Sequence, residues 1–373
     1  MNKIRNALNL VEEKSKLNIM YFGNRFPSAA TFDNVYKIVD NEDWTEGFWT
    51  GILWMMYQYS GDTIFRATAS ANITSFSNRN KNHIVLDHHD LGFLYSLSCV
   101  AAYKIVGDEN AKRQGLIAAD KLLNRWHDKP GFIQAWGAMD NEKEHRFIID
   151  SLLNLPLLYW ASDVNDDDKY RDVAKRHYTI CVDYLIRENG STYHTYFVDP
   201  ITSLPTTGVT AQGFADDSSW ARGQAWSIYG IALNYGHAPS ADAMDKFIKV
   251  TDYFIDRLPE DNVSYWDLVF TDGSGHVRDS SATAIAVCGI LEMIQYIDDE
   301  PLTKRLLKSV DLMMDSLIEN YSNKELSPGS PLLDHGVYSW HENNGVDEGN
   351  AWGDYFYVEA LMRLVNPEWK PFW

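Results

Sequence analysis

The chain contains few cysteines, and their spacing does not indicate a disulfide or a metal site. Its 373 residues include three, widely separated and each set in an apolar stretch: Cys99, Cys181 and Cys288. There is no C-x-x-C pair and no spacing typical of a structural zinc site. We therefore expect buried free thiols in a reducing compartment rather than a disulfide-stabilised fold, and no metal ligation by cysteine.

Long apolar runs are also absent. No segment approaches the roughly 18 consecutive apolar residues that indicate a membrane span. The first 20 residues are charged and amphipathic, without the continuous apolar region of a signal peptide. These absences predict a cytoplasmic protein that does not bind a membrane.

Positive charge is scarce. The chain has 33 Lys and Arg against 52 Asp and Glu, a formal net charge of −19, and the basic residues form no stripe. A chain with this balance repels polyanions, so nucleic-acid binding is not expected. The balance leaves room for a local positive pocket.

Aromatic residues, in contrast, are abundant. There are 13 Trp, 21 Tyr and 16 Phe. Side chains of this kind stack on flat or ring-shaped ligands, although they also fill an ordinary large core.

No low-complexity linker divides the chain, and two kinds of helical stretch alternate along it. Six stretches are apolar nearly all round: 44–60, 90–106, 146–162, 219–234, 279–297 and 350–365. Five amphipathic stretches follow the first five after short acidic turns: 62–77, 108–126, 167–186, 240–258 and 300–318. A helix at about 2–18 is left to pair with the sixth. The pattern predicts an all-α fold in which residues 1–373 form one toroid of six inner and six outer helices; the alternative is an open array.

In such a toroid the six inner helices run in the same direction, and their N-terminal ends meet at one opening. Each N-terminus carries a partial positive charge and free N–H groups, which favour an anionic ligand. The segments that lead into these helices are rich in Asp, His, Arg and Trp, whereas the opposite ends are plainer. We therefore expect a binding cleft at this opening.

Two aspartates stand out among these segments. Asp150 follows the start of the third apolar stretch, in the run HRFIIDSLLNLPLLYW (145–160). Apolar surroundings raise the pKa of a carboxyl group and suit it to general-acid catalysis, but an acid that complements the helix dipole is the simpler alternative. Asp90 begins the second inner stretch, where it fits equally well as an N-cap.

Other polar residues near the opening are candidates for ligand binding or for a structural role. Arg222 lies between Trp220 and Trp226, either in a buried ion pair or as a fork that holds a carboxylate beside apolar walls for a sugar ring. His88 and His89 are adjacent and lack the spacing of a metal pair. His194 lies in a long connection that reaches to Gln212, and connections of this length are often functional.

Seven motifs in this order resemble the unsaturated glucuronyl hydrolases of glycoside hydrolase family 88. They are DWTEGFW, LDHHDLGFLYSLS, IIDSLLNLPLLYW, YHTYF, WARGQAWSIYG, RDSSATAI and WGDYFYVEALMRL. The resemblance extends from about Phe22 to Leu364. It implies an (α/α)6 barrel and an enzyme that removes a terminal 4,5-unsaturated uronic acid from oligosaccharides produced by polysaccharide lyases. It also implies that no cofactor and no metal is needed.

The resemblance assigns roles to individual residues. Asp150 corresponds to the general acid and base, and Asp90 to its essential partner. The positions that match the subsite for the unsaturated sugar are Trp44, Trp136, His194, Gln212, Arg222 and Trp226, with His89 as a further contact.

The segment before the last inner helix departs from the family pattern. Some members that favour sulfated disaccharides carry two serines and a lysine there; this chain keeps Ser339 but has Gly336 and His341 at the other positions. His341 would still donate to a sulfate when protonated. The sequence therefore leaves sulfated and unsulfated substrates open.

Two other functions are compatible with the same barrel. One is an unsaturated rhamnogalacturonyl hydrolase acting on pectin fragments, and the other is a non-catalytic carbohydrate-binding toroid. The paired acids argue against the latter, because a binding module has no need of them. The sequence does not distinguish a monomer from a weak homo-oligomer.

Overall fold

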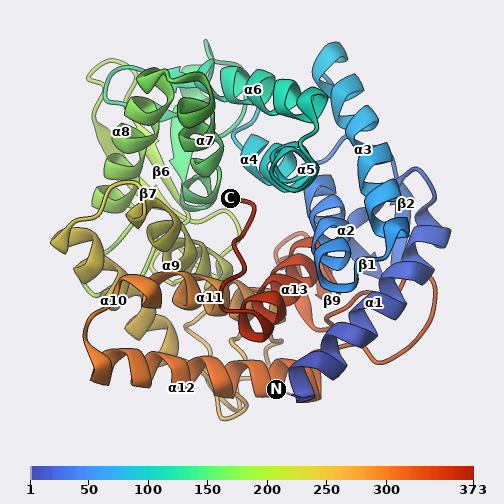
Figure 1. Ribbon diagram of the computed structural model, residues 1–373. Coiled ribbons are helices and arrows are strands. Elements are labelled where there is room, and N and C mark those ends of the chain that lie inside the picture. The colour runs from blue at the N-terminus through green and yellow to red at the C-terminus, as the bar shows by residue number, and fades with distance from the viewer. Residues whose placement is uncertain (1) are drawn as a thin grey trace.

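The computed structural model describes residues 2–373 and confirms the closed ring of paired helices (Figure 1). The inner helices are α2 (Glu46–Ser60), α4 and α5 (Leu91–Tyr95 and Ala101–Val106, continuous through a π-helical turn), α7 (Pro156–Asn165), α9 (Ala221–Tyr235), α11 (Ser280–Met293) and α13 (Ala351–Val365). The outer helices are α1 (Asn2–Phe22), α3 (Thr63–Asn82), α6 (Glu109–Leu123), α8 (Asp168–Tyr184), α10 (Ala241–Ile255) and α12 (Glu300–Ser316). As predicted, α1 packs against α13 and closes the ring.

Burial follows the two kinds of stretch. The inner helix α9 is buried along its whole length except for its last residue, Tyr235. The outer helix α10 buries only one face, which carries Ala243, Phe247, Val250 and Phe254. A helix with a single apolar face belongs on the outside of the ring, and one that is apolar all round belongs inside.

Short turns join the inner helices to the outer helices that follow, and several of these turns end in an aspartate. Asp62, Asp108 and Asp167 each accept a hydrogen bond from a backbone N–H in the first turn of the outer helix. Gly61 and Gly107 end the preceding inner helices in the left-handed conformation, which costs glycine little. Each cap contributes about 1 kcal/mol to stability.

The third inner helix begins later than the sequence predicted. Residues 146–148 form strand β5 (Arg146–Ile148), Ile149–Leu153 form a 3-10 turn, and α7 starts only at Pro156. A proline has no N–H for an intrahelical bond and is favoured in the first turn, so it sets the start of α7. Asp150 therefore lies in the turn that leads into the helix rather than one turn inside it.

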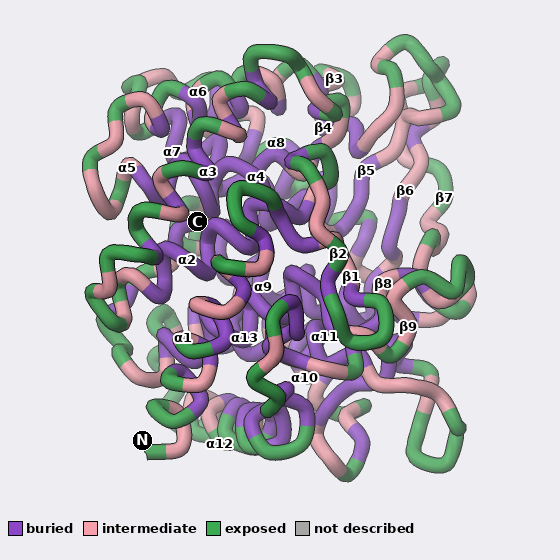
Figure 2. Tube along the Cα trace, turned by 90° about the vertical axis from the view of Figure 1, so that its right-hand side faces the viewer, coloured by how far each residue is buried: buried purple, intermediate pink, exposed green. Residues whose placement is uncertain are grey.

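The sequence pattern did not indicate the short antiparallel strands. They are β1 (Phe26–Phe32), β2 (Val35–Val39), β3 (Trp126–His127), β4 (Phe132–Ile133), β5, β6 (Thr195–Val198), β7 (Pro205–Val209), β8 (Gly336–Ser339) and β9 (Asn344–Glu348). They form three hairpins and the three-stranded sheet β5-β6-β7. All of them gather on one side of the barrel, the right-hand side of Figure 2. They form the rim of the opening at which the inner helices begin.

The residues after α13 turn back to the middle of the ring (Figure 1). The indole of Trp373 is nearly parallel to the ring of Phe356, with centroids 6.0 Å apart, and its N–H donates to Glu359. Phe93, which contacts Trp373, also contacts Trp226. The tail thus fills the centre of the barrel behind aromatic residues of the opening. Within residues 2–373, no helix combines the length and the apolar character that a membrane span requires.

Candidate active site

A cavity of about 200 Å³ opens among the N-terminal ends of the inner helices. Residues from five of the six inner-helix approaches and from two rim hairpins reach it. They are Trp44, Asp90, Trp136, Asp150, His194, Ala211, Gln212, Trp220, Arg222, Trp226 and Tyr338. Six of the seven residues that the sequence assigned to the sugar subsite line this cavity together with both aspartates, and the seventh, His89, does not.

Asp90 and Asp150 approach each other across the imidazole of His89. The Nε2 atom of His89 lies 3.3 Å from Oδ1 of Asp90 and 3.5 Å from Oδ1 of Asp150. His89 is buried, and neither ring nitrogen has a hydrogen bond of good geometry within the described part of the chain. The two carboxyl groups therefore share one imidazole and face the same space.

Burial raises the pKa of Asp150 well above its ordinary value, and the negative charge of Asp90 raises it further. The side chain is 20% exposed, so it remains accessible from the cavity. A raised pKa favours the protonated carboxyl group that a general acid requires.

Asp90 is the ionised member of the pair. Burial works against its ionised form, but His89, His88 and Asn154 outweigh this effect and lower the pKa of Asp90. Although Asp90 occupies the N-cap position of α4, its carboxylate makes no capping hydrogen bond. The N-cap alternative therefore does not account for this side chain, which is free to face the cavity.

His89 is neutral at neutral pH, because burial lowers its pKa to about 4. Among the described residues 2–373, His89, Asp90 and Asp150 form the one group of three potential metal-ligating side chains, with ligand atoms within 4.8 Å of one another. A cation there would have to displace the proton of Asp150. The donor set is therefore better suited to proton transfer than to holding a metal.

Arg222 is buried and donates to four protein acceptors. One terminal nitrogen donates to Asp279, at 3.1 Å, and to the carbonyl of Val337. The other donates to Oε1 of Gln212, at 2.6 Å, and to the carbonyl of Tyr338, at 2.8 Å. Of the two interpretations from the sequence, the buried ion pair therefore describes Arg222. Among its four acceptors, Gln212 is the partly exposed side chain that lines the cavity.

Indole rings form the apolar walls. Trp44 stacks on Trp352 with centroids 5.1 Å apart, and its N–H donates to the hydroxyl of Tyr338. Trp136 also lines the cavity, beneath the guanidinium of Arg146, which lies 4.7 Å from the centroid of its ring. Such walls suit the apolar face of a sugar ring.

His194 presents a fixed donor. The backbone N–H of Ala211 donates to its Nδ1 atom, at 3.0 Å, so the neutral ring carries its proton on Nε2. Burial lowers the pKa of His194 to about 3, which keeps the ring neutral. Because His194 lines the cavity, this N–H can donate to a bound ligand.

Comparisons with known proteins identify the family of the chain. The model of Glycosyl Hydrolase Family 88 matches residues 19–364. The chain belongs to glycoside hydrolase family 88. An unsaturated chondroitin disaccharide hydrolase of Streptococcus pyogenes serotype M1 is 51% identical over 371 residues, which are 99% of this chain and 93% of the relative.

Solved structures of family 88 members have the same fold. The crystal structure of an unsaturated glucuronyl hydrolase from Streptococcus agalactiae superposes with a TM-score of 0.98 at 50% identity, covering 100% of this chain and 94% of the other. A mutant of that enzyme complexed with dGlcA-GalNAc6S has a TM-score of 0.90 at 48% identity, with 99% and 93% covered. The (α/α)6 barrel and the enzyme class expected from the sequence are confirmed.

Ser339 and His341 do not line the cavity of this family 88 enzyme. Ser339 is buried at the end of β8, opposite Asn344 in the hairpin. His341 is exposed, and its Nε2 atom lies 2.7 Å from the carbonyl of Gly213. Tyr338, from the same hairpin, does reach the cavity, and the sequence analysis did not single it out.

Asn154 is a second residue that the sequence analysis missed. It is buried, its amide oxygen accepts the N–H of Phe93, and its amide nitrogen lies 3.3 Å from the carbonyl of Asp150 and 3.5 Å from Oδ1 of Asp90. A Cβ atom on Gly92 would lie 2.5 Å from Asn154 Cα, so only glycine permits this close approach. Asn154 thus joins the two segments that carry the aspartates.

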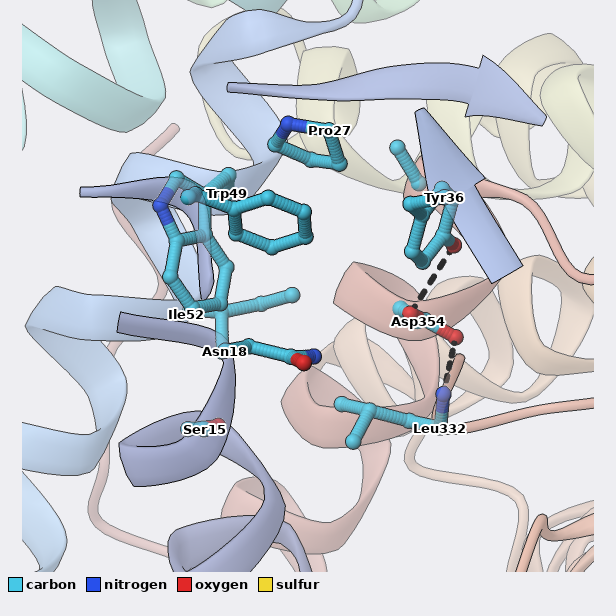
Figure 3. A pocket seen from close by; sticks show the side chains of 10 residues that line it. Ser15, Asn18, Pro27, Tyr36, Trp49, Ile52, Leu332 and Asp354 are labelled. Carbon is cyan, nitrogen blue, oxygen red and sulfur yellow. Dashed lines mark hydrogen bonds between the residues drawn. The ribbon is translucent and has the colours of Figure 1, made fainter. Parts of the chain in front are cut away.

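A second cavity lies between α1, α2 and α13 (Figure 3). Its volume of about 10 Å³ has room for about one water molecule and excludes a sugar. Asp354 borders it and accepts hydrogen bonds from the hydroxyl of Tyr36 and from the backbone N–H of Leu332, as Figure 3 shows. Burial raises the pKa of Asp354 to about 7. This acid is structural and lies outside the active site.

Proposed function

We propose that the chain releases the terminal 4,5-unsaturated uronic acid from unsaturated glycosaminoglycan disaccharides and related lyase products. The observation that carries this proposal is the pair of aspartates, Asp90 and Asp150, which approach the same imidazole in a cavity walled by indoles. The acid, the anion and the apolar walls match a reaction that begins with proton transfer to the carbon of a sugar double bond.

The proposed reaction starts at the vinyl ether of the substrate, whose double bond joins C4 and C5. Asp150 gives its proton to C4, and positive charge develops on C5 and the ring oxygen. A water molecule then bonds to C5 and returns a proton to the Asp150 carboxylate. The resulting hemiketal opens at the bond between C5 and the ring oxygen, and the glycosidic bond breaks as the product rearranges.

In this scheme Asp90 has two tasks. Its negative charge keeps Asp150 protonated before the reaction, and its oxygens accept hydrogen bonds from a substrate hydroxyl or from the attacking water. Since neither carboxylate attacks the sugar, the rule that relates carboxyl separation to stereochemical outcome does not apply.

The remaining cavity residues hold the sugar. His194 donates through Nε2, and Trp44, Trp136 and Trp226 provide apolar walls. The uronate carboxylate is placed near Arg222 and Gln212, where the guanidinium supplies positive charge and Gln212 can exchange its contact with Arg222 for one with the substrate. His89 lies between the two aspartates and places a neutral imidazole beside both carboxyl groups.

A panel of unsaturated disaccharides tests the function. We expect the protein to remove the ultraviolet absorbance of the double bond from chondroitin-type disaccharides. We propose that 6-sulfation is tolerated but contributes little to kcat/KM, because Ser339 and His341 lie outside the cavity. Activity only on unsaturated rhamnogalacturonan disaccharides, or on none of the panel, would contradict the proposal.

Removing the Asn154 amide tests how the two aspartates are held. Asn154→Ser is expected to lower kcat about tenfold with little change in KM, because the proton donor shifts relative to C4. The matched control is Asn234→Ser: Asn234 is also buried and donates to the carbonyl of Leu152 in the same turn, but contacts neither aspartate. Equal losses of kcat in both variants would show that Asn154 acts only on stability.

We further propose that the protein acts in the cytoplasm as one catalytic domain spanning residues 1–373. Its three cysteines are buried and unpaired, which suits a reducing compartment. A monomer or a weak homo-oligomer is compatible with a cavity whose lining comes from one chain.

A further inference from the structure

The stretch RDSSATAI (278–285) leads into α11, but the proposed reaction gives it no role. Its aspartate, Asp279, occupies the N-cap of α11 and is completely buried, with a side-chain exposure of 0%. It does not line the cavity. A buried carboxylate costs free energy unless it is paired and hydrogen-bonded, so its partners indicate what it does.

One oxygen of Asp279 pairs with the cation of the cavity. Its Oδ2 atom accepts a hydrogen bond from Arg222, at 3.1 Å. The carbonyls of Val337 and Tyr338 hold the same guanidinium from the rim hairpin. Arg222 is therefore fixed from two sides, and Asp279 supplies the one carboxylate among these contacts.

The other oxygen begins a chain of contacts that leads to Trp352 and Trp44. Oδ1 accepts the backbone N–H of Ser281, at 3.2 Å, and its hydroxyl, at 2.5 Å. The oxygen of that hydroxyl accepts the indole N–H of Trp352, at 2.9 Å. Trp352 stacks on Trp44, the cavity wall, with an interplanar angle of 26°.

We propose that Asp279 is a positioning residue of the active site: one oxygen fixes Arg222 and balances its charge beside Asp150, while the other, through Ser281, fixes the Trp352–Trp44 wall. This inference rests on the proposed function. It gives a residue outside the cavity two tasks inside it, one for each carboxylate oxygen. The two groups that it holds are neighbours, because the guanidinium of Arg222 lies over the ring of Trp352, 4.7 Å from its centroid.

The charge balance matters because few groups face Asp150. From the start of α4 these are Asp90 and His89, from α9 Arg222, and from α8 the thiol of Cys181. His89 is neutral, with a pKa of about 4, and burial raises the pKa of the Cys181 thiol, so it is neutral too. Arg222 is the cation among them and lowers the pKa of Asp150. Without its carboxylate partner, its effect on Asp150 would be stronger.

Asp279→Asn tests the first task. The amide keeps the shape of the side chain and an acceptor for Ser281, but leaves Arg222 uncompensated. The reaction needs protonated Asp150, and a stronger positive charge makes Asp150 lose its proton at a lower pH. We therefore expect the high-pH limb of the kcat/KM profile to move to lower pH, and kcat/KM at pH 7.5 to fall about tenfold.

Ser281→Ala tests the second task and keeps the ion pair. We expect the high-pH limb to stay at the wild-type position while KM rises several-fold, because the wall loses its anchor. The control is Asp354→Asn, which removes a buried acid from the first turn of α13 without touching the cavity. It is expected to lower stability and to change neither the limb nor KM.

If the high-pH limb of the kcat/KM profile of Asp279→Asn stays at the wild-type position, Asp279 does not have the first task. If KM is unchanged in Ser281→Ala, it does not have the second. If Asp279→Asn does not fold, the double variant Asp279→Asn with Arg222→Gln removes both members of the buried ion pair. The high-pH limb of its kcat/KM profile is expected at a higher pH than that of the wild type. A limb at or below the wild-type position there contradicts the proposal as well.

Unfolding in urea separates this inference from the proposed function. A double-mutant cycle over Asp279 and Arg222 needs no substrate and is expected to show non-additive changes in the free energy of unfolding. Additive changes would overturn the coupling. If the wild type processes no unsaturated disaccharide, the proposed function fails while this cycle still decides whether the two side chains are coupled.

Discussion

Asp150→Asn is expected to lower kcat on an unsaturated disaccharide by on the order of 10³-fold. The amide matches the carboxyl in shape but has no proton acidic enough to give to C4. Because Asp150 is already neutral in the buried site, the substitution removes no buried charge, so the urea midpoint of unfolding should not fall. Loss of absorbance of the double bond measures the reaction.

Binding provides the control for this variant. Quenching of tryptophan fluorescence by the disaccharide should report a Kd within a few-fold of the wild-type value, since the indole walls are unchanged. Loss of turnover with retained binding places Asp150 in the chemical step. Turnover within a few-fold of the wild type would remove it from that role.

Arg79→Met is expected to destabilise the protein by about 3–5 kcal/mol, the typical cost of breaking a buried ion pair. The guanidinium of Arg79 is fully buried, 3.1 Å from Glu46, a carboxyl whose pKa burial raises to about 7. Arg79 also donates to Asp43 and Val85, in the segments that carry Trp44 and Asp90. Without it, Glu46 is left unpaired and both segments lose an anchor.

Urea unfolding measures this change, and a surface pair provides the comparison. Arg305 lies 2.7 Å from Asp252, but both side chains are more than a third exposed. Arg305→Met should therefore cost about 1 kcal/mol or less. If Arg79→Met costs no more than this control, the buried pair does not hold the two segments. Combining Arg79→Met with Glu46→Gln should recover part of the loss.

Much of the fold was predictable because it depends on local pattern. The apolar stretches became inner helices, the amphipathic ones outer helices, and Asp62, Asp108 and Asp167 cap as expected. The boundaries of the third inner helix differ from the predicted ones because tertiary contacts overrode the local pattern. Residues 146–148 looked helical, yet they pair with β6, and Pro156 sets the true start of α7.

The active site was predictable only in part. The resemblance indicated Asp90, Asp150 and the cavity tryptophans, and the structure brings them together. It did not indicate Asn154 or Tyr338, whose importance comes from contacts with residues far away in the sequence. Ser339 and His341 were reasonable candidates by position, but of the residues near them only Tyr338 lines the cavity: Ser339 is buried at the end of β8, and His341 lies in the turn that follows.

The sequence by itself determined that twelve helices form and which side of each is buried, because hydrophobic periodicity and capping are local properties. It also determined the chemical groups available at the ends of the inner helices. Only the tertiary structure decided that the pKa of Asp150 is raised while that of Asp90 is lowered, and that Asp279 pairs with Arg222. These properties depend on burial and on charges brought together through space by closure of the ring, and no stretch of sequence contains them alone.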